Sequence, residues 1–143
     1  MILPDVNVLI YAFRVDTPEH VRAAAWLEGL VARAGELALC DAVVSGFLRI
    51  VTHPKVLSPP TPIENALGFV RWLIEAPGVH WLGPSPSVWE TFERIADTDR
   101  GIRGNLVPDA YLAALCLAHG TEIGTADRDF ARFDGLRRVD PLA

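Results

Sequence analysis

The feature that most constrains the fold is a short apolar run at the start of the chain with one carboxylate set into it. Residues 2–10 read Ile-Leu-Pro-Asp-Val-Asn-Val-Leu-Ile. The beginning of this run predicts a buried central strand, which puts Asp5 at the strand's carboxyl end, where open α/β sheets form their sites. Asn7 is then expected to cap a helix that begins at Val8. The alternative is that Asp5 is itself only a turn or capping residue, because Asp and Asn serve both purposes.

The rest of the chain alternates between short apolar runs and longer amphipathic segments. A helix over residues 19–33 is followed by a strand over 36–40, so strand, helix and strand follow one another as in a βαβ unit. The pattern predicts an α/β fold with a mostly parallel sheet, in a single domain over residues 1–143. Further helices are expected over 41–52, 63–75, 87–96 and 108–120, strands over 79–82, 122–125 and 137–139, and loops over 58–62 and 97–105.

Composition excludes several classes of protein. No apolar run approaches the roughly 20 residues of a membrane span, so no membrane association is expected. The chain enters the predicted strand directly from Met1, without a recognisable leader, which favours a cytoplasmic location. Cys40 and Cys116 stand in apolar surroundings and are expected to be buried, reduced thiols. The four histidines are scattered and no CxxC pair occurs, so any metal should be bound by oxygen.

The charge balance argues against a broad nucleic-acid-coating surface. Thirteen basic and 18 acidic residues give a net charge of −5. The composition still allows a localised nucleic-acid-binding site. All the basic residues except Lys55 are arginines, which suit bidentate phosphate contacts.

Three separate segments place aspartates where parallel strands end or helices start. They contribute Asp5, Asp109, and Asp127 with Asp129. Clustered carboxylates repel one another, so such a group suggests a shared proton or a bound cation. Mg²⁺ suits an all-oxygen site completed by substrate phosphate, and Mn²⁺ is a substitute. A metal-activated water attacking a phosphodiester is the natural reaction. A plainer explanation for Asp109 is that it stabilises the first turn of its helix through the helix dipole.

Three short motifs follow one another over nearly the whole chain. They are Asp5-x-Asn7, Pro108-Asp109-Ala110-x-Leu112-Ala113-Ala114 and Thr125-Ala126-Asp127-Arg128-Asp129-Phe130. In this order they resemble the PIN-domain family, specifically its VapC-type ribonuclease toxins. A further segment, residues 45–54 (SGFLRIVTHP), resembles a mycobacterial-type branch of that family, and Asp140-Pro141 resembles its usual ending.

The resemblance implies a three-layer α/β/α sandwich and a Mg²⁺-dependent endoribonuclease. It also implies a homodimer and a cognate VapB-type antitoxin. Carried over residue by residue, the metal ligands and catalytic residues would be Asp5, Asp109 and Asp127. The residues with supporting roles would be Asn7 and Thr125, which orient ligands or waters, and Asp129 as an additional acid.

Two positions depart from the family pattern. Many members carry a glutamate on the second helix where this chain has Gly46, and Asp41 is more than a turn away. Either Ser45 holds a water in place of the missing acid, or the metal binds more weakly until RNA phosphate arrives. The second departure is Pro4, which cannot donate to a sheet, so a local irregularity is expected there.

Two other functions fit parts of the sequence. Aspartyl-phosphate enzymes also begin with an apolar strand ending in Asp, but they use a lysine to neutralise phosphate, and Lys55 lies in a predicted loop. A PIN-like module that binds RNA or protein without cutting, or cuts weakly, is motivated by the missing glutamate. Its groove for an antitoxin segment would be lined in part by aromatic residues that could equally be core: Trp26, Phe47, Trp72, Trp81 and Trp89.

Overall fold

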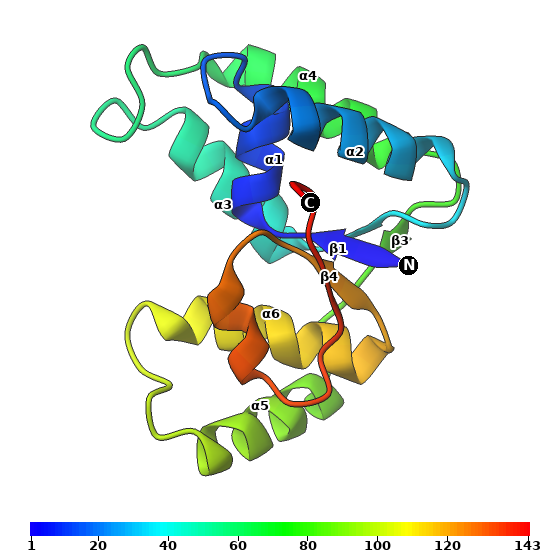
Figure 1. The fold of residues 1–143 in the computed structure, drawn as a ribbon, viewed down its shortest axis with the longest axis vertical. Coiled ribbons are helices and arrows are strands. Elements are labelled where there is room, and N and C mark those ends of the chain that lie inside the picture. Colours follow the sequence, from blue (N-terminus) through cyan, green and yellow to red (C-terminus); the bar gives the residue numbers. More distant parts are fainter.

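The computed structural model describes residues 1–143 and contains six α-helices, five short strands and one 3-10 helix (Figure 1). The helices are α1 (Val6–Phe13), α2 (His20–Ala32), α3 (Asp41–Val51), α4 (Ile63–Ile74), α5 (Pro86–Thr98), α6 (Leu106–His119) and the 3-10 helix η1 (Arg128–Arg132). The strands are β1 (Ile2–Pro4), β2 (Ala38–Leu39), β3 (His80–Trp81), β4 (Glu122–Gly124) and β5 (Arg138–Val139).

The strands lie between two layers of helices. In Figure 1, α1 to α4 cover one side of the strands, and α5 and α6 cover the other. One continuous apolar core joins the layers, with Leu3 of β1, Phe47 of α3 and Leu115 of α6 all fully buried. This arrangement confirms the predicted three-layer α/β/α sandwich. Cys40 and Cys116 are buried free thiols, as expected from their apolar neighbours.

All strand pairings are parallel, as the sequence predicts. β1 pairs with β4, and β4 with β5, in a three-stranded sheet. β2 pairs with β3 in a separate two-stranded sheet, joined to β1 by a single bridge between Ile2 and Leu37. Because the strands run parallel, the residues that follow β1, β2 and β4 emerge at one edge.

Pro4 accounts for the break between the two sheets. Ile2 donates its backbone N–H toward the β2 side, to Glu36 O at 2.8 Å, and Asp5 donates to Gly124 O of β4 at 2.9 Å. Donors of a parallel strand alternate between its two neighbours, so the donor that Pro4 lacks is the next one toward β2. The irregularity expected at Pro4 is therefore the interruption of the β1–β2 ladder.

Two helix starts differ from the sequence-based predictions. Asp5, not Asn7, caps α1, because the Asp5 carboxylate accepts the backbone N–H of Val8 in the first turn. The helix therefore begins at Val6, two residues earlier than predicted. α6 begins at Leu106 rather than Pro108, because Gly104 adopts a positive φ of 56° and turns the chain before it. None of the helices is both long and apolar enough to span a membrane.

Candidate functional site

Asp5 is a buried carboxylate with both oxygens engaged. Its side chain is 5% exposed, and Oδ1 accepts a hydrogen bond from the backbone N–H of Val8 at 3.1 Å. Oδ2 accepts from the Thr125 hydroxyl. Burial raises the pKa of Asp5, and the hydrogen bonds from Thr125 and the α1 backbone oppose that rise. Asp5 therefore caps a helix and also presents a carboxylate at the sheet edge.

Thr125 connects this carboxylate to the segment after β4. It is fully buried, and its Oγ1 accepts the backbone N–H of Asp127 at 3.0 Å while its hydroxyl donates to Asp5. Asp127 in turn caps η1, accepting the N–H of Asp129 at 2.9 Å. One buried hydroxyl thus fixes the positions of two of the predicted acids.

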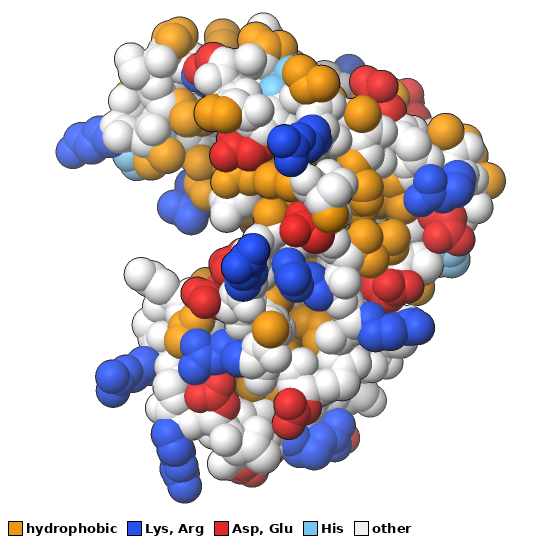
Figure 2. Space-filling model, viewed as in Figure 1, with side chains coloured by type: hydrophobic (Ala, Val, Ile, Leu, Met, Phe, Trp, Pro, Cys, Tyr) orange, Lys and Arg blue, Asp and Glu red, His pale blue; other side chains and the backbone are white.

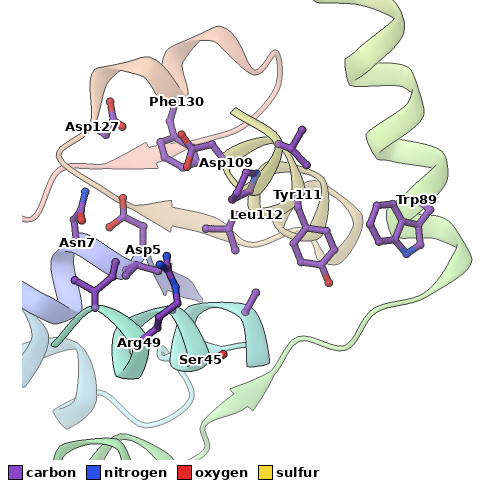
Figure 3. A pocket seen from close by; sticks show the side chains of 16 residues that line it. Asp5, Asn7, Ser45, Arg49, Trp89, Asp109, Tyr111, Leu112, Asp127 and Phe130 are labelled. Atoms are coloured by element: carbon purple, nitrogen blue, oxygen red, sulfur yellow. The ribbon is translucent and has the colours of Figure 1, made fainter. Parts of the chain in front are cut away.

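A pocket of about 540 Å³ opens between α3 and α6 at this edge (Figure 3). Figure 2 shows the surface hollowed between the two helical layers, with Lys and Arg side chains on both sides of the hollow. A second pocket of about 240 Å³ adjoins it and shares Asp5, Asn7 and Asp127 with it, adding Thr125 and Tyr11. The polar and aromatic residues lining the larger pocket are Asp5, Asn7, Ser45, Arg49, Trp89, Asp109, Tyr111, Asp127 and Phe130.

Asp109 enters this pocket from the first turn of α6. Its pKa is raised from 3.8 to about 6, first by partial burial and then by repulsion from Asp127, Asp5 and Asp129. A helix N-terminus alone would lower the pKa of a carboxyl group. The surroundings of Asp109 therefore oppose its charge on balance, and Asp127, Asp5 and Asp129 contribute to that opposition.

The third side of the pocket is α3, which contributes Ser45, Gly46 and Arg49. Figure 3 shows the Arg49 side chain reaching into the pocket. A side-chain carbon placed on Gly46 would lie 3.0 Å from Cγ2 of Val6, closer than ordinary packing allows. The helix therefore approaches the segment beside Asp5 at the position where the family pattern has glutamate.

The structure brings most of the predicted site together and separates some of it. Asp5, Asn7, Ser45, Asp109 and Asp127 line the larger pocket. Thr125 does not line the larger pocket; it is buried and contacts the site through its hydrogen bond to Asp5. Asp129 is exposed and lines neither of these two pockets, although its charge contributes to the raised pKa of Asp109. The roles given to these residues stay predictions.

The sequence reasoning assigned no role in the acid site to Arg49 or Tyr111. Arg49 could have been found, because it stands four residues after Ser45 and hence on the same helix face. Tyr111 stands two residues after Asp109 on a helix that reads as apolar nearly all round, so no periodic signal marks it.

The aromatic residues that the sequence offers for an antitoxin groove lie in different surroundings, and their binding of an antitoxin stays a prediction. Phe47 is fully buried, and Trp26 packs against the position of Gly124 in β4. Trp72 and Trp81 are partly exposed but lie outside the pocket, whereas Trp89 lines it. Lys55 lies in a turn after α3 and lines neither acidic pocket, which removes support for an aspartyl-phosphate site.

The donor set fits a hard divalent cation by its chemistry. The possible metal ligands here are carboxylates from three segments of the chain. Their mutual repulsion is of the kind that a bound cation relieves. No three His, Cys, Asp or Glu side chains are close enough in this arrangement to hold a metal ion between them.

Comparison with known proteins identifies the family. The PIN domain model matches residues 2–136. Ribonuclease VapC48 of Mycobacterium tuberculosis is 39% identical over 140 residues, covering 97% of this chain and 96% of the relative. Ribonuclease VapC43 of the same organism is 40% identical over 142 residues, covering 99% and 96%. Ribonuclease VapC33 is 37% identical, covering 99% of both chains.

Solved structures show the same fold at low sequence identity. VapBC-1 from nontypeable Haemophilus influenzae superposes with a TM-score of 0.70 at 17% identity, covering 100% of both chains. VapBC2 from Rickettsia felis, bound to a promoter DNA fragment, gives 0.68 at 17% identity, covering 97% of this chain and 98% of that one. With the family model and the curated relatives, this places the chain in the PIN-domain family, in its VapC branch.

Proposed function

We propose that this protein is a divalent-metal-dependent endoribonuclease that acts as the toxin of a VapBC-type pair. The observation that carries the proposal is the meeting of Asp5, Asp109 and Asp127 from three separate segments in one pocket. Relatives at 37–40% identity over nearly the whole chain are named ribonucleases, which supports the same activity here.

The metal we propose is Mg²⁺, with Mn²⁺ as a substitute. Asp5, Asp109 and Asp127 would hold it. When bound, such a cation polarises a phosphodiester and lowers the pKa of an attacking water. Mg²⁺ keeps several waters and takes few carboxylates, so a site with no fourth acid at Gly46 remains compatible with it.

The residues around the acids have separate tasks in this proposal. Arg49 binds a phosphate oxygen of the RNA from the α3 side, since guanidinium forms paired hydrogen bonds to phosphate. Thr125 holds Asp5 and the Asp127 backbone in position. Asn7 and Ser45 line the pocket and orient water or substrate there, and Asp129 adds negative charge from outside it.

The proposed partners follow from the family. A VapB-type antitoxin would bind the toxin, a pairing supported by the solved VapBC structures that share this fold. We also propose a homodimer, and a cytoplasmic location where RNA is available.

The test is cleavage of a total-RNA pool by purified, antitoxin-free protein with Mg²⁺, with Mn²⁺ and with EDTA. Defined cuts that EDTA abolishes are expected. Asp109→Asn should abolish them as well, since it removes one acid of the group. Asp97→Asn is the matched control, because Asp97 is exposed on α5 outside the pocket and should keep full activity.

The opposite result has a definite meaning. If folded protein binds RNA but cuts it with neither metal, the non-catalytic binding module suggested by the missing glutamate at position 46 is correct. If Asp109→Asn cuts as well as the wild type, the acid cluster is not the active site.

A further inference from the structure

The pocket has an aromatic end that the acid chemistry does not use. Trp89 of α5 lines the pocket and is 53% exposed, although tryptophan usually buries most of its surface. Its ring centroid lies 5.4 Å from that of Tyr111 on α6, with 43° between the planes, and 5.5 Å from that of Phe92. Figure 3 shows the Trp89 and Tyr111 rings adjacent at the side of the pocket away from Asp127.

These two ring contacts leave more than half of the Trp89 residue exposed, and both Trp89 and Tyr111 line the pocket. Phe92 and Tyr111 hold the indole in place, so little freedom would be lost when a ligand covers it. An exposed aromatic surface in a pocket is unfavourable in water unless something flat and apolar covers it.

The remainder of the same pocket indicates what that ligand is. It contains Arg49, a phosphate-binding side chain, and the three acids proposed to hold the metal. A charged end for phosphate beside an aromatic end matches a nucleotide, whose charged backbone and flat base lie side by side. An apolar peptide segment would match the aromatic end but would leave the charged residues unpaired.

We propose that Trp89 and Tyr111 form a stacking platform for an unpaired base of the RNA, next to the phosphate at which the chain is cut. This inference rests on the proposed ribonuclease function and names its substrate class. A base within a duplex has both faces covered by its neighbours, so it cannot stack on a protein ring. The platform therefore selects RNA that is single-stranded at the cut.

The test measures binding to two labelled strands by fluorescence anisotropy. One is a short single-stranded RNA, and the other is the same sugar-phosphate backbone without bases. Ca²⁺ replaces Mg²⁺, because it occupies oxygen sites with looser geometry, and titrations end before a gel shows any cut RNA. The variants are Trp89→Ala and, as matched control, Trp72→Ala, since Trp72 is 39% exposed on α4 outside the pocket.

Trp89→Ala should weaken binding of the RNA about tenfold, the usual effect of removing one stacked aromatic side chain. It should leave binding of the base-free strand unchanged. Trp72→Ala should match the wild type on both strands, and Trp89→Phe should recover part of the lost affinity. Circular dichroism checks that each variant is folded, which is expected because the Trp89 side chain is half exposed.

Three results would overturn the platform. They are equal affinity of the wild type for both strands, no binding of either strand, and an unchanged RNA affinity in Trp89→Ala. In the last case the exposed ring would instead serve a protein partner. Cutting of RNA by the wild type with Mg²⁺ is measured separately, in the cleavage assay above, so failure of the platform is distinct from failure of the proposed nuclease.

Discussion

Asp109 is the acid whose ionisation its surroundings oppose most. Its pKa of about 6 lies above the value of 3.8 expected for the unfolded chain, so the native state binds more protons between these values. The free energy of unfolding must then fall as the pH rises from about 4 to about 6. Over this range the unfolded chain loses the Asp109 proton, whereas the native state must either keep it or place a charge beside the other acids. The metal-free protein carries this penalty in full at neutral pH.

Asp109→Asn should therefore stabilise the metal-free protein at pH 7.5. We expect a gain in the free energy of unfolding of about 1 kcal/mol, after discounting the pKa shift for the partial solvent exposure of this group. The gain should shrink toward zero at pH 4, where the native carboxyl group is protonated. Urea denaturation in EDTA at both pH values measures it. A loss of stability at pH 7.5 would mean that the helix dipole dominates after all.

Single residues also show how far sequence reasoning reaches. Asp5 and Asn7 are two residues apart and both cap helices well, so the sequence alone cannot decide which carboxyl or amide oxygen faces the free N–H groups. The structure decides in favour of Asp5 because Thr125, 120 residues away, fixes its other oxygen. A hydrogen bond between such distant residues leaves no periodic trace in the sequence.

Among the elements, the turns after α2 and α4 touch each other. Gly35 and Gly78 have positive φ angles of 80° and 66°, and the Gly35 N–H donates to Pro77 O at 3.0 Å. A side-chain carbon on Gly78 would lie 2.9 Å from the Gly35 backbone nitrogen, whereas one on Gly35 would meet nothing within 4 Å. The two turns can approach this closely only because residue 78 has no side chain.

Gly78→Ala should consequently destabilise the protein more than Gly35→Ala. Both substitutions force alanine into a left-handed backbone, at about 1–2 kcal/mol. Gly78→Ala adds a clash with backbone that cannot move aside, which costs roughly another 1–3 kcal/mol. Thermal unfolding of the two variants compares them directly. Equal losses would show that the contact between the turns relaxes freely.

The elements themselves were largely predictable because each has a local signal. The apolar spacing of α2, α3 and α4 gives their bounds to within one or two residues. The strands have only two or three residues each, so their pairing depends on the helices that pack on them. Pro4 is the exception, since its missing N–H allowed an irregular sheet to be expected from the sequence.

At the scale of the whole molecule, a net charge of −5 has to coexist with binding of RNA. Arg49 is the only basic residue that lines the acidic pocket. The RNA affinity of this protein should therefore depend less on salt concentration than that of nucleic-acid-binding proteins that make many phosphate contacts. Arg49→Gln should lower the slope of log affinity against log salt by about 0.7, the value for one contact to a single-stranded backbone.

Arg71→Gln is the control for that measurement. Arg71 is exposed on α4, away from the pocket, and its loss should leave the slope unchanged. The same titration series, repeated at several salt concentrations, supplies both slopes. An equal decrease for the two variants would mean that the overall charge, and not a contact inside the pocket, governs binding.

The interruption at Pro4 divides the strands into two hydrogen-bonded units, joined by a single bridge. The amides of His80 and Leu82 donate to Leu37 and Leu39, within the unit that contains β2 and β3. The amide of Asp5 donates to Gly124, within the unit that contains the acid site. In native-state hydrogen exchange, the His80 and Leu82 amides should exchange through a lower-energy opening than the Asp5 amide. The backbone hydrogen bond that fixes Asp5 against β4 would then persist while the pairing of β2 with β3 opens.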